Sequence, residues 1–260
     1  MQISDHVDDI ARATGFLSRL PVPSRYFEGH DGSLSRASGM FPAAGVVIAL
    51  LPGLAMLLLT LLGANPALTA LIALAVFIGV TGALHEDGLA DSADAFGARR
   101  GRDHMLEIMK DSRSGTYGVL ALVISLALRA TALTILLSVL GGWSAFLVLL
   151  AVAAASRAAI SWHWNALPPA RQDGVAASVG APEESDATRS LFLGGILFLV
   201  LATPSAGLVP ALLALGILAA CVSQWTRVVR NKLNGHTGDT LGASQQIAET
   251  ACLVTLALLI

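Results

Sequence analysis

Long apolar runs separated by short polar segments dominate the chain. Residues 37–84 carry no Asp, Glu, Lys or Arg, and residues 190–226 form a second uncharged run. A helix needs about 20 mainly apolar residues to cross the hydrocarbon core of a bilayer. The apolar runs therefore predict an all-α fold, a polytopic integral membrane helical bundle of about seven transmembrane helices. We place them at 41–62, 67–84, 117–140 and 143–164, as a pair within 190–226, and at 240–260.

The N-terminal segment is mixed in polarity. Residues 5–20 predict a short amphipathic helix that ends at Pro21 and Pro23. It either lies at the membrane interface or packs on the bundle. We treat 1–260 as a single membrane-embedded domain, with 1–36 as a cytoplasmic or interfacial N-terminal segment.

The connections between the predicted helices differ in charge. Residues 63–66, 141–142 and 203–207 contain no charged residue, and in a seven-helix topology every charged loop falls on the opposite side. Because Lys and Arg mark the cytoplasmic side of a membrane protein, we expect the charged loops to face the cytoplasm. The localisation that we expect is the bacterial inner membrane, with several membrane passes.

Composition supports a membrane protein. Charged residues make up only 13% of the chain and hydrophobic residues 55%, whereas a soluble domain is about 25% charged. The net charge of −2 gives no support for a nucleic-acid partner. The lipid bilayer is the expected surrounding, and the sequence leaves open whether the chain is a homo-oligomer.

Residues 85–116 form an acidic segment that interrupts the apolar pattern. The segment contains twelve of the charged residues of the chain, which has 16 Lys and Arg and 18 Asp and Glu in all. On a helix, the spacing of Asp87, Asp91 and Asp94 puts the three carboxylates within about 60° of one another. They would repel unless a divalent cation bound them, and oxygen-only ligands suit Mg²⁺ or Mn²⁺. The segment therefore predicts metal-assisted chemistry at a phosphate. The alternative is a solvated acidic face that pairs with the nearby arginines.

Further candidates follow the acidic helix. Asp111 could join the metal site from a second helix end, and Lys110 and Arg113 could bind phosphate or lipid headgroups. Arg129 and Arg157 lie inside predicted helices, where a charge usually faces the bundle interior or a water-filled pocket. We expect Arg157 to reach the acids or an anionic substrate, and we leave Arg129 unassigned.

A glycine-rich turn at 234–242 leads into the last predicted helix. Backbone N–H groups at a helix start can bind phosphate, which makes His236 and Thr237 candidate substrate contacts. Asp239 could be a base, a ligand or simply an N-cap. Trp162, His163 and Trp164 are typical of an interfacial anchor rather than of a catalytic group.

Three motifs of the chain resemble those of one family. They are Thr81-Gly82-x-x-His85-x-Asp87-Gly88-Leu89-Ala90-Asp91-x-x-Asp94, then Leu106-Glu107-Ile108-Met109-Lys110-Asp111-Ser112-Arg113-x-Gly115-Thr116-x-Gly118, then Gly235-His236-Thr237-Gly238-Asp239-Thr240-Leu241-Gly242-Ala243 with Glu249 beyond. This order resembles adenosylcobinamide-GDP ribazoletransferase, the cobalamin (cobalamin 5'-phosphate) synthase family. Ala95 and Asn234 stand where the family commonly has Gly.

The resemblance implies a reaction. The ribose 3'-OH of α-ribazole, or of its 5'-phosphate, would attack the cobinamide-linked phosphate of adenosylcobinamide-GDP, and GMP would leave. Mg²⁺ is the implied cofactor. We expect Asp87, Asp91, Asp94 and Asp111 to bind the metal, Lys110, Arg113, Arg157, His236 and Thr237 to contact the substrate, and Asp239 or His85 to act as the general base.

Two other functions stay open. The acidic motif is similar in its chemistry to that of the CDP-alcohol phosphotransferases, which act on phospholipid head groups. A cation or proton transporter would also use acidic side chains, although transport acids should lie within the spans rather than follow one.

Overall fold

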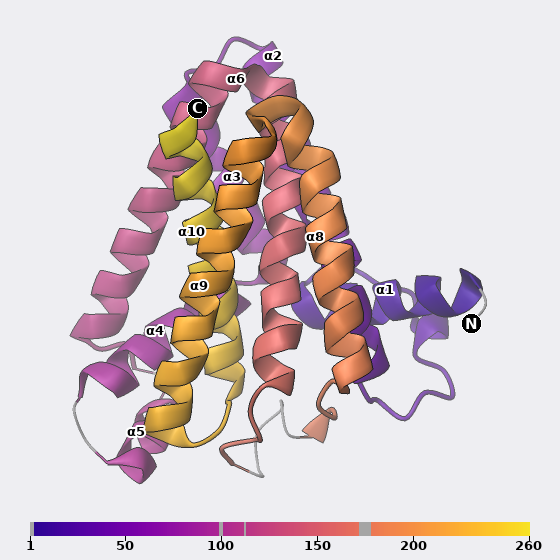
Figure 1. Cartoon of the computed structure of the whole chain (residues 1–260), viewed down its shortest axis with the longest axis vertical. Coiled ribbons are helices and arrows are strands. Elements are labelled where there is room, and N and C mark those ends of the chain that lie inside the picture. The colour runs from indigo at the N-terminus through magenta and orange to yellow at the C-terminus, as the bar shows by residue number, and fades with distance from the viewer. Residues whose placement is uncertain (1–2, 99–100, 112, 172–177) are drawn as a thin grey trace.

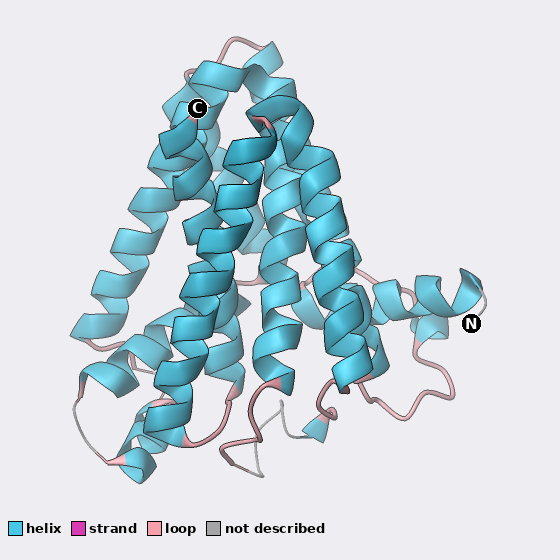
Figure 2. Cartoon of the chain, in the orientation of Figure 1, coloured by secondary structure: helices cyan, strands magenta, loops and turns pink. Residues whose placement is uncertain are grey.

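The computed structural model describes residues 3–98, 101–111, 113–171 and 178–260. These residues form helices and no strand (Figure 2), so the predicted all-α class is confirmed. In chain order the elements are α1 (Ile3–Leu17), η1 (Ser24–Tyr26), η2 (Arg36–Met40), α2 (Phe41–Leu61), α3 (Pro66–Thr81), α4 (Leu84–Gly97), α5 (Arg102–Ile108), α6 (Thr116–Asn165), α8 (Glu184–Ala206), α9 (Leu208–Leu233) and α10 (Gly238–Leu259).

The longest element, α6, is two helices joined by a sharp bend. Gly141 has φ 79° and ψ 171°, a backbone conformation outside the helical region. Only glycine enters this region without steric cost. The two arms of α6 therefore run in opposite directions along the bundle (Figure 1), as the separate predictions of 117–140 and 143–164 require.

The two ends of the bundle differ in character. The α2–α3 turn, the bend in α6 and the turn at Gly207 lie at one end (Figure 1). The charged helices α4 and α5 lie at the other end, as do the loops that follow α6 and α9. The structure thus separates the uncharged connections from the charged ones.

By a criterion of length and composition, fewer helices qualify as membrane spans than the sequence predicts. Among the described residues four helices are long and apolar enough to cross a membrane, or five if the bent pair α3 and α4 is one span. The chain is therefore a multi-pass membrane protein, but the predicted count of about seven is not confirmed. The 50-residue α6 counts once despite its bend, α3 has only 16 residues, and α10 is polar in its first half.

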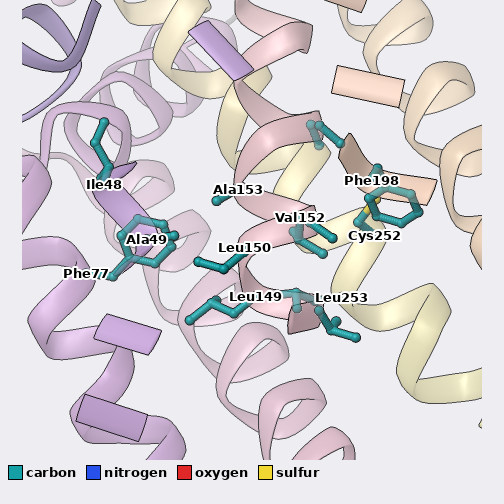
Figure 3. Close-up of a cluster of buried hydrophobic side chains, with 14 of the residues drawn as sticks. Ile48, Ala49, Phe77, Leu149, Leu150, Val152, Ala153, Phe198, Cys252 and Leu253 are labelled. Carbon is teal, nitrogen blue, oxygen red and sulfur yellow. The ribbon is translucent and has the colours of Figure 1, made fainter. Parts of the chain in front are cut away.

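The core of the bundle is apolar and forms around the second arm of α6. Leu149, Leu150, Val152 and Ala153 of this arm lie between side chains from α2, α3, α8 and α10 (Figure 3). The outward faces are apolar as well, which for a single chain indicates contact with an apolar medium. On α2 and α8 several of these side chains are more than half exposed; they are Leu51, Leu54, Leu58, Leu61, Phe192, Ile196 and Val200.

A bend of 89° separates α3 from α4 and turns α4 across the charged end of the bundle. Gly82 and Ala83 both have positive φ, 64° and 59°. A Cβ atom at Gly82 would overlap the side chain of Arg19. The turn at Gly82 and Ala83 therefore sets the direction of the acidic helix.

The N-terminal helix α1 packs on the bundle through Ala13 and Leu17, which are buried. Phe16 stacks on Trp164 with ring centroids 6.3 Å apart. Trp164 and His163 are fully buried, so the expected interfacial anchor is wrong for these two residues. Helix α1 covers the end of α6, which removes Trp164 from the surface.

Candidate functional site

The acidic helix α4 lies against the start of α10 with almost no space between the two backbones. A Cβ atom at Gly88 would lie 2.6 Å from the carbonyl oxygen of Asp239, and one at Gly242 would lie 3.3 Å from the Cα of Gly88. Two glycines thus permit the contact between the first and third motifs. The contact brings the carboxylates of α4 toward Asp239.

A cavity of about 260 Å³ opens between these two helix starts. His85, Asp87, Arg171 and Asp239 supply its charged and polar lining, and side chains of α1, α4, α6 and α10 supply the apolar wall. We call this cavity the carboxylate pocket. It joins His85 and Asp239, the two candidate bases of the sequence, with the predicted metal ligand Asp87.

Negative charge is concentrated beside the carboxylate pocket. Partial burial, together with the charges of Asp87, Asp239 and Asp94, raises the pKa of Asp91 to about 7. Among the described residues, however, no three His, Cys, Asp or Glu side chains form a group that could by itself hold a metal ion. The site therefore offers crowded carboxylate oxygens without a closed metal cage.

His85 is buried at the wall of this pocket, and its Nε2 atom has no hydrogen-bond partner in the described part of the chain. Burial holds the pKa of His85 well below its ordinary value, and the positive charges of Arg157 and Arg129 lower it further. The imidazole is therefore neutral at pH 7, and the same burial and nearby positive charges make it a weak base.

Asp94 has a structural role in addition to its place on the acidic face. Its carboxylate accepts hydrogen bonds from the backbone N–H groups of Gly115, at 2.7 Å, and Gly118, at 2.9 Å. A Cβ atom at either glycine would collide with this carboxylate. Asp94 thus caps the N-terminus of α6, and the two glycines of the second motif make room for it.

The other residues of the second motif lie farther out. Asp111 is bound by the guanidinium of Arg113, which lowers the pKa of that carboxyl to about 2. Lys110 lines a second cavity of about 200 Å³ together with Asp103, Glu107 and Arg171. We call it the Lys110 pocket.

The turn before α10 is fixed to the loop after α6. The N–H of His236 donates to the carbonyl of Pro168, and the N–H of Ala170 donates to the carbonyl of His236, both at 2.8 Å. Arg102 binds this pair of segments through the carbonyls of Leu233 and Ala170. The turn that carries Asp239 is therefore held from two sides.

The residues of this turn have defined places. Thr237 is the N-cap of α10, in a capping box with Thr240, and its hydroxyl donates to Asp239. Asp239 is therefore not the N-cap. His236 is buried, and neither of its ring nitrogens has a hydrogen-bond partner among the residues that the structure describes. Burial lowers its pKa to about 4.

Arg129 and Arg157 lie in a buried ionic network rather than in the lining of the carboxylate pocket. Arg129 binds Glu249 at 2.9 Å and Glu86 at 3.2 Å, and Arg157 binds Glu249 at 3.0 Å. Arg157 is 1% exposed, so the expected direct contact with an anionic substrate is not what the structure shows. The network joins α4, both arms of α6, and α10.

Comparison with known proteins identifies the family of the chain. Residues 9–257 match the family described as cobalamin-5-phosphate synthase. The chain belongs to the cobalamin-5-phosphate synthase family. This membership makes it a transferase of cobalamin biosynthesis and confirms the resemblance in its motifs.

Curated relatives match the chain over its length and carry one name, adenosylcobinamide-GDP ribazoletransferase. A protein of Rhizobium johnstonii is 51% identical over 99% of both chains. One of Sinorhizobium medicae is 51% identical over 100% of this chain and 99% of its own. One of Brucella ovis is 41% identical over 98% of each. No solved structure matches the chain.

In this cobalamin-5-phosphate synthase family member, sequence reasoning missed two parts of the site. Glu249 closes the third motif, but nothing in its spacing pairs it with Arg129. Arg171 belongs to no motif and lies in the polar loop after α6, yet it lines both pockets. A charged residue in the loop that faces the acidic helix is the only signal that could have indicated it.

Proposed function

We propose that the chain joins adenosylcobinamide-GDP to α-ribazole, or to α-ribazole 5'-phosphate, and releases GMP. The observation that carries this proposal is the meeting of the first and third motifs at the carboxylate pocket, in a chain of the cobalamin-5-phosphate synthase family. The relatives named adenosylcobinamide-GDP ribazoletransferase support the choice of substrates.

The reaction has a simple balance. The ribose hydroxyl oxygen forms a bond to the cobinamide-linked phosphorus, and the bond from that phosphorus to the bridging oxygen breaks. GMP leaves with the bridging oxygen, and the hydroxyl proton passes to a base. Asp239 and His85 are the candidates, because both line the carboxylate pocket and His85 has a free ring nitrogen.

A metal ion fits the donor set of this pocket. Asp87 in the pocket and Asp91 beside it offer only oxygen atoms, and partial burial together with neighbouring negative charge raises the pKa of Asp91. Mg²⁺ commonly takes one or two carboxylates together with water and substrate phosphates. When bound, Mg²⁺ would screen the charge of the phosphate oxygens. Asp94 and Asp111 remain predicted ligands, in competition with the N-terminus of α6 and with Arg113.

The charged end of the bundle is proposed to face the cytoplasm of a bacterium, with the apolar faces in its inner membrane. The concentration of basic residues at that end supports this orientation. Lys110, Arg113, His236 and Thr237 would then meet a nucleotide-linked substrate that arrives from the cytoplasm.

Substrate assays separate this proposal from its rivals. The purified protein in detergent or nanodiscs is given adenosylcobinamide-GDP with α-ribazole, and in parallel a CDP-alcohol with a lipid acceptor. We expect GMP from the first pair and no CMP from the second. Release of CMP alone would favour a head-group transferase, and ion flux into liposomes without nucleotide would favour a transporter.

A further inference from the structure

Arg171 occupies the place where the two pockets of the charged end share a wall. On one side it lines the carboxylate pocket with Asp87 and Asp239. On the other side it lines the Lys110 pocket with Lys110 and Glu107. A ligand that occupies both pockets would therefore contact Arg171 in each of them.

The guanidinium of Arg171 has unused hydrogen-bonding capacity. Its side chain is only 19% exposed, and among the described residues its nearest acid is Asp239, with 3.8 Å between Nη2 and Oδ2. That separation is too long for a hydrogen bond. The Nη1 atom is buried without a partner among the described residues.

Neighbouring arginines at this end differ from Arg171. Arg102 donates to two backbone carbonyls, and Arg113 binds both oxygens of Asp111. A partly buried cation without such partners is costly, because it loses water and gains no hydrogen bond. An anionic ligand in the pocket would supply the missing acceptors.

Phosphate matches this arrangement better than a carboxylate of the protein does. The planar fork of a guanidinium binds two phosphate oxygens at once. We propose that Arg171 binds the phosphates of a nucleoside-diphosphate-linked substrate where the two pockets meet, and that it holds the phosphate of the departing nucleotide. The inference rests on the proposed function and assigns it a residue that the motifs do not contain.

Product inhibition by GMP tests this role, since GMP carries the departing phosphate. Arg171→Gln should raise the inhibition constant of GMP and the KM for adenosylcobinamide-GDP by roughly tenfold to a hundredfold, the range for loss of a charge-assisted hydrogen-bond pair. The KM for α-ribazole should stay within about twofold. Arg171→Lys keeps the charge but loses the fork, so it should fall between wild type and Arg171→Gln.

A matched control is Arg227→Gln, which removes the same charge from an exposed position of α9 that lines neither pocket. It should leave both constants unchanged. If Arg171→Gln cannot be purified in folded form, the inhibition constant of GMP for Arg171→Lys alone tests the proposal. An inhibition constant for GMP within twofold of wild type in Arg171→Gln would overturn the proposal, and so would a constant in Arg171→Lys that equals that of wild type.

Direct binding of GMP keeps this inference separate from the proposed function. Arg171-dependent binding of GMP by a wild-type protein that does not turn over would support the role of Arg171 and refute the transferase proposal. Turnover by the wild-type protein, with GMP binding unchanged in Arg171→Gln, would support the transferase proposal and refute the role of Arg171.

Discussion

At the residue scale, the account depends on the carboxylates that crowd the start of α4. Partial burial of Asp91, together with the negative charges of Asp87, Asp239 and Asp94, raises its pKa to about 7. A natural structure retains such repulsion where a ligand offsets it. This crowding is the physical basis for the predicted metal.

Removal of the Asp91 charge should abolish catalysis without unfolding the protein. Asp91→Asn loses a predicted metal ligand but relieves repulsion, so the thermal midpoint in detergent should not fall. GMP release should drop by at least about a hundredfold, which corresponds to roughly 2.7 kcal/mol of transition-state stabilisation. Asp31→Asn, in an exposed loop, is the control. Near-normal turnover by Asp91→Asn would remove the metal hypothesis.

Mg²⁺ binding should depend on pH through the same group. With a pKa of about 7, Asp91 is protonated below pH 7, and a protonated carboxyl must release its proton before it binds a metal. The apparent affinity for Mg²⁺ should therefore fall by up to about tenfold per pH unit below 7 and level off above it. Calorimetry in two buffers of different ionisation enthalpy measures the released proton. An affinity that is constant between pH 8 and pH 6 would contradict this.

Helical spacing predicted which aspartates share a face, because that property is local. It could not predict that Asp94 caps α6, since the donors are the backbone N–H groups of Gly115 and Gly118, more than twenty positions away. The place of Arg171 in the site could not be predicted for the same reason. Its neighbours Asp87 and Asp239 come from two distant helices.

At the scale of elements, the close contact of α4 with α10 places the site. Gly88→Ala should push the helices apart, because the new Cβ atom would lie 2.6 Å from a backbone carbonyl that cannot rotate away. We expect a loss of about 1–3 kcal/mol in stability, the usual cost of overpacking, and a larger loss of activity. Gly79→Ala is the control, since a Cβ atom there meets nothing within 4 Å. Thermal unfolding and GMP release of both variants decide between these outcomes.

The buried network should stabilise the arrangement of α4, α6 and α10. Glu249→Gln leaves Arg129 and Arg157 without their shared carboxylate, and breaking a buried ion pair typically costs about 3–5 kcal/mol. The midpoint of thermal unfolding in detergent should fall clearly. The exposed Glu28→Gln should leave it unchanged. A Glu249→Gln protein as stable as wild type would show that the network contributes little.

Helix boundaries were predictable where glycine marks the turns, at Gly141 and Gly207, because glycine adopts positive φ without steric cost. Asn234 also has positive φ, which Asn tolerates better than most residues, so its replacement of Gly leaves the turn intact. The burial of Trp164 was not predictable, because it results from packing by Phe16 of α1.

At the scale of the whole molecule, the separation of charged and uncharged ends predicts an orientation. In a chain whose own cysteines are replaced, Asn65→Cys in the α2–α3 turn should react with an impermeant maleimide in spheroplasts. Arg227→Cys at the charged end should react only after permeabilisation, because the basic end faces the cytoplasm. Labelling in the opposite order would invert the topology.

The central claim is that the charged end of this bundle performs a metal-dependent transfer that releases GMP. The most direct measurement is GMP production from adenosylcobinamide-GDP plus α-ribazole by the purified protein, with Mg²⁺ and with Mg²⁺ removed by a chelator. The account predicts GMP and a cobalamin product in equal amounts with Mg²⁺, and neither product after chelation. Equal GMP release in the presence and absence of Mg²⁺, or no release under either condition by a folded protein, would contradict it.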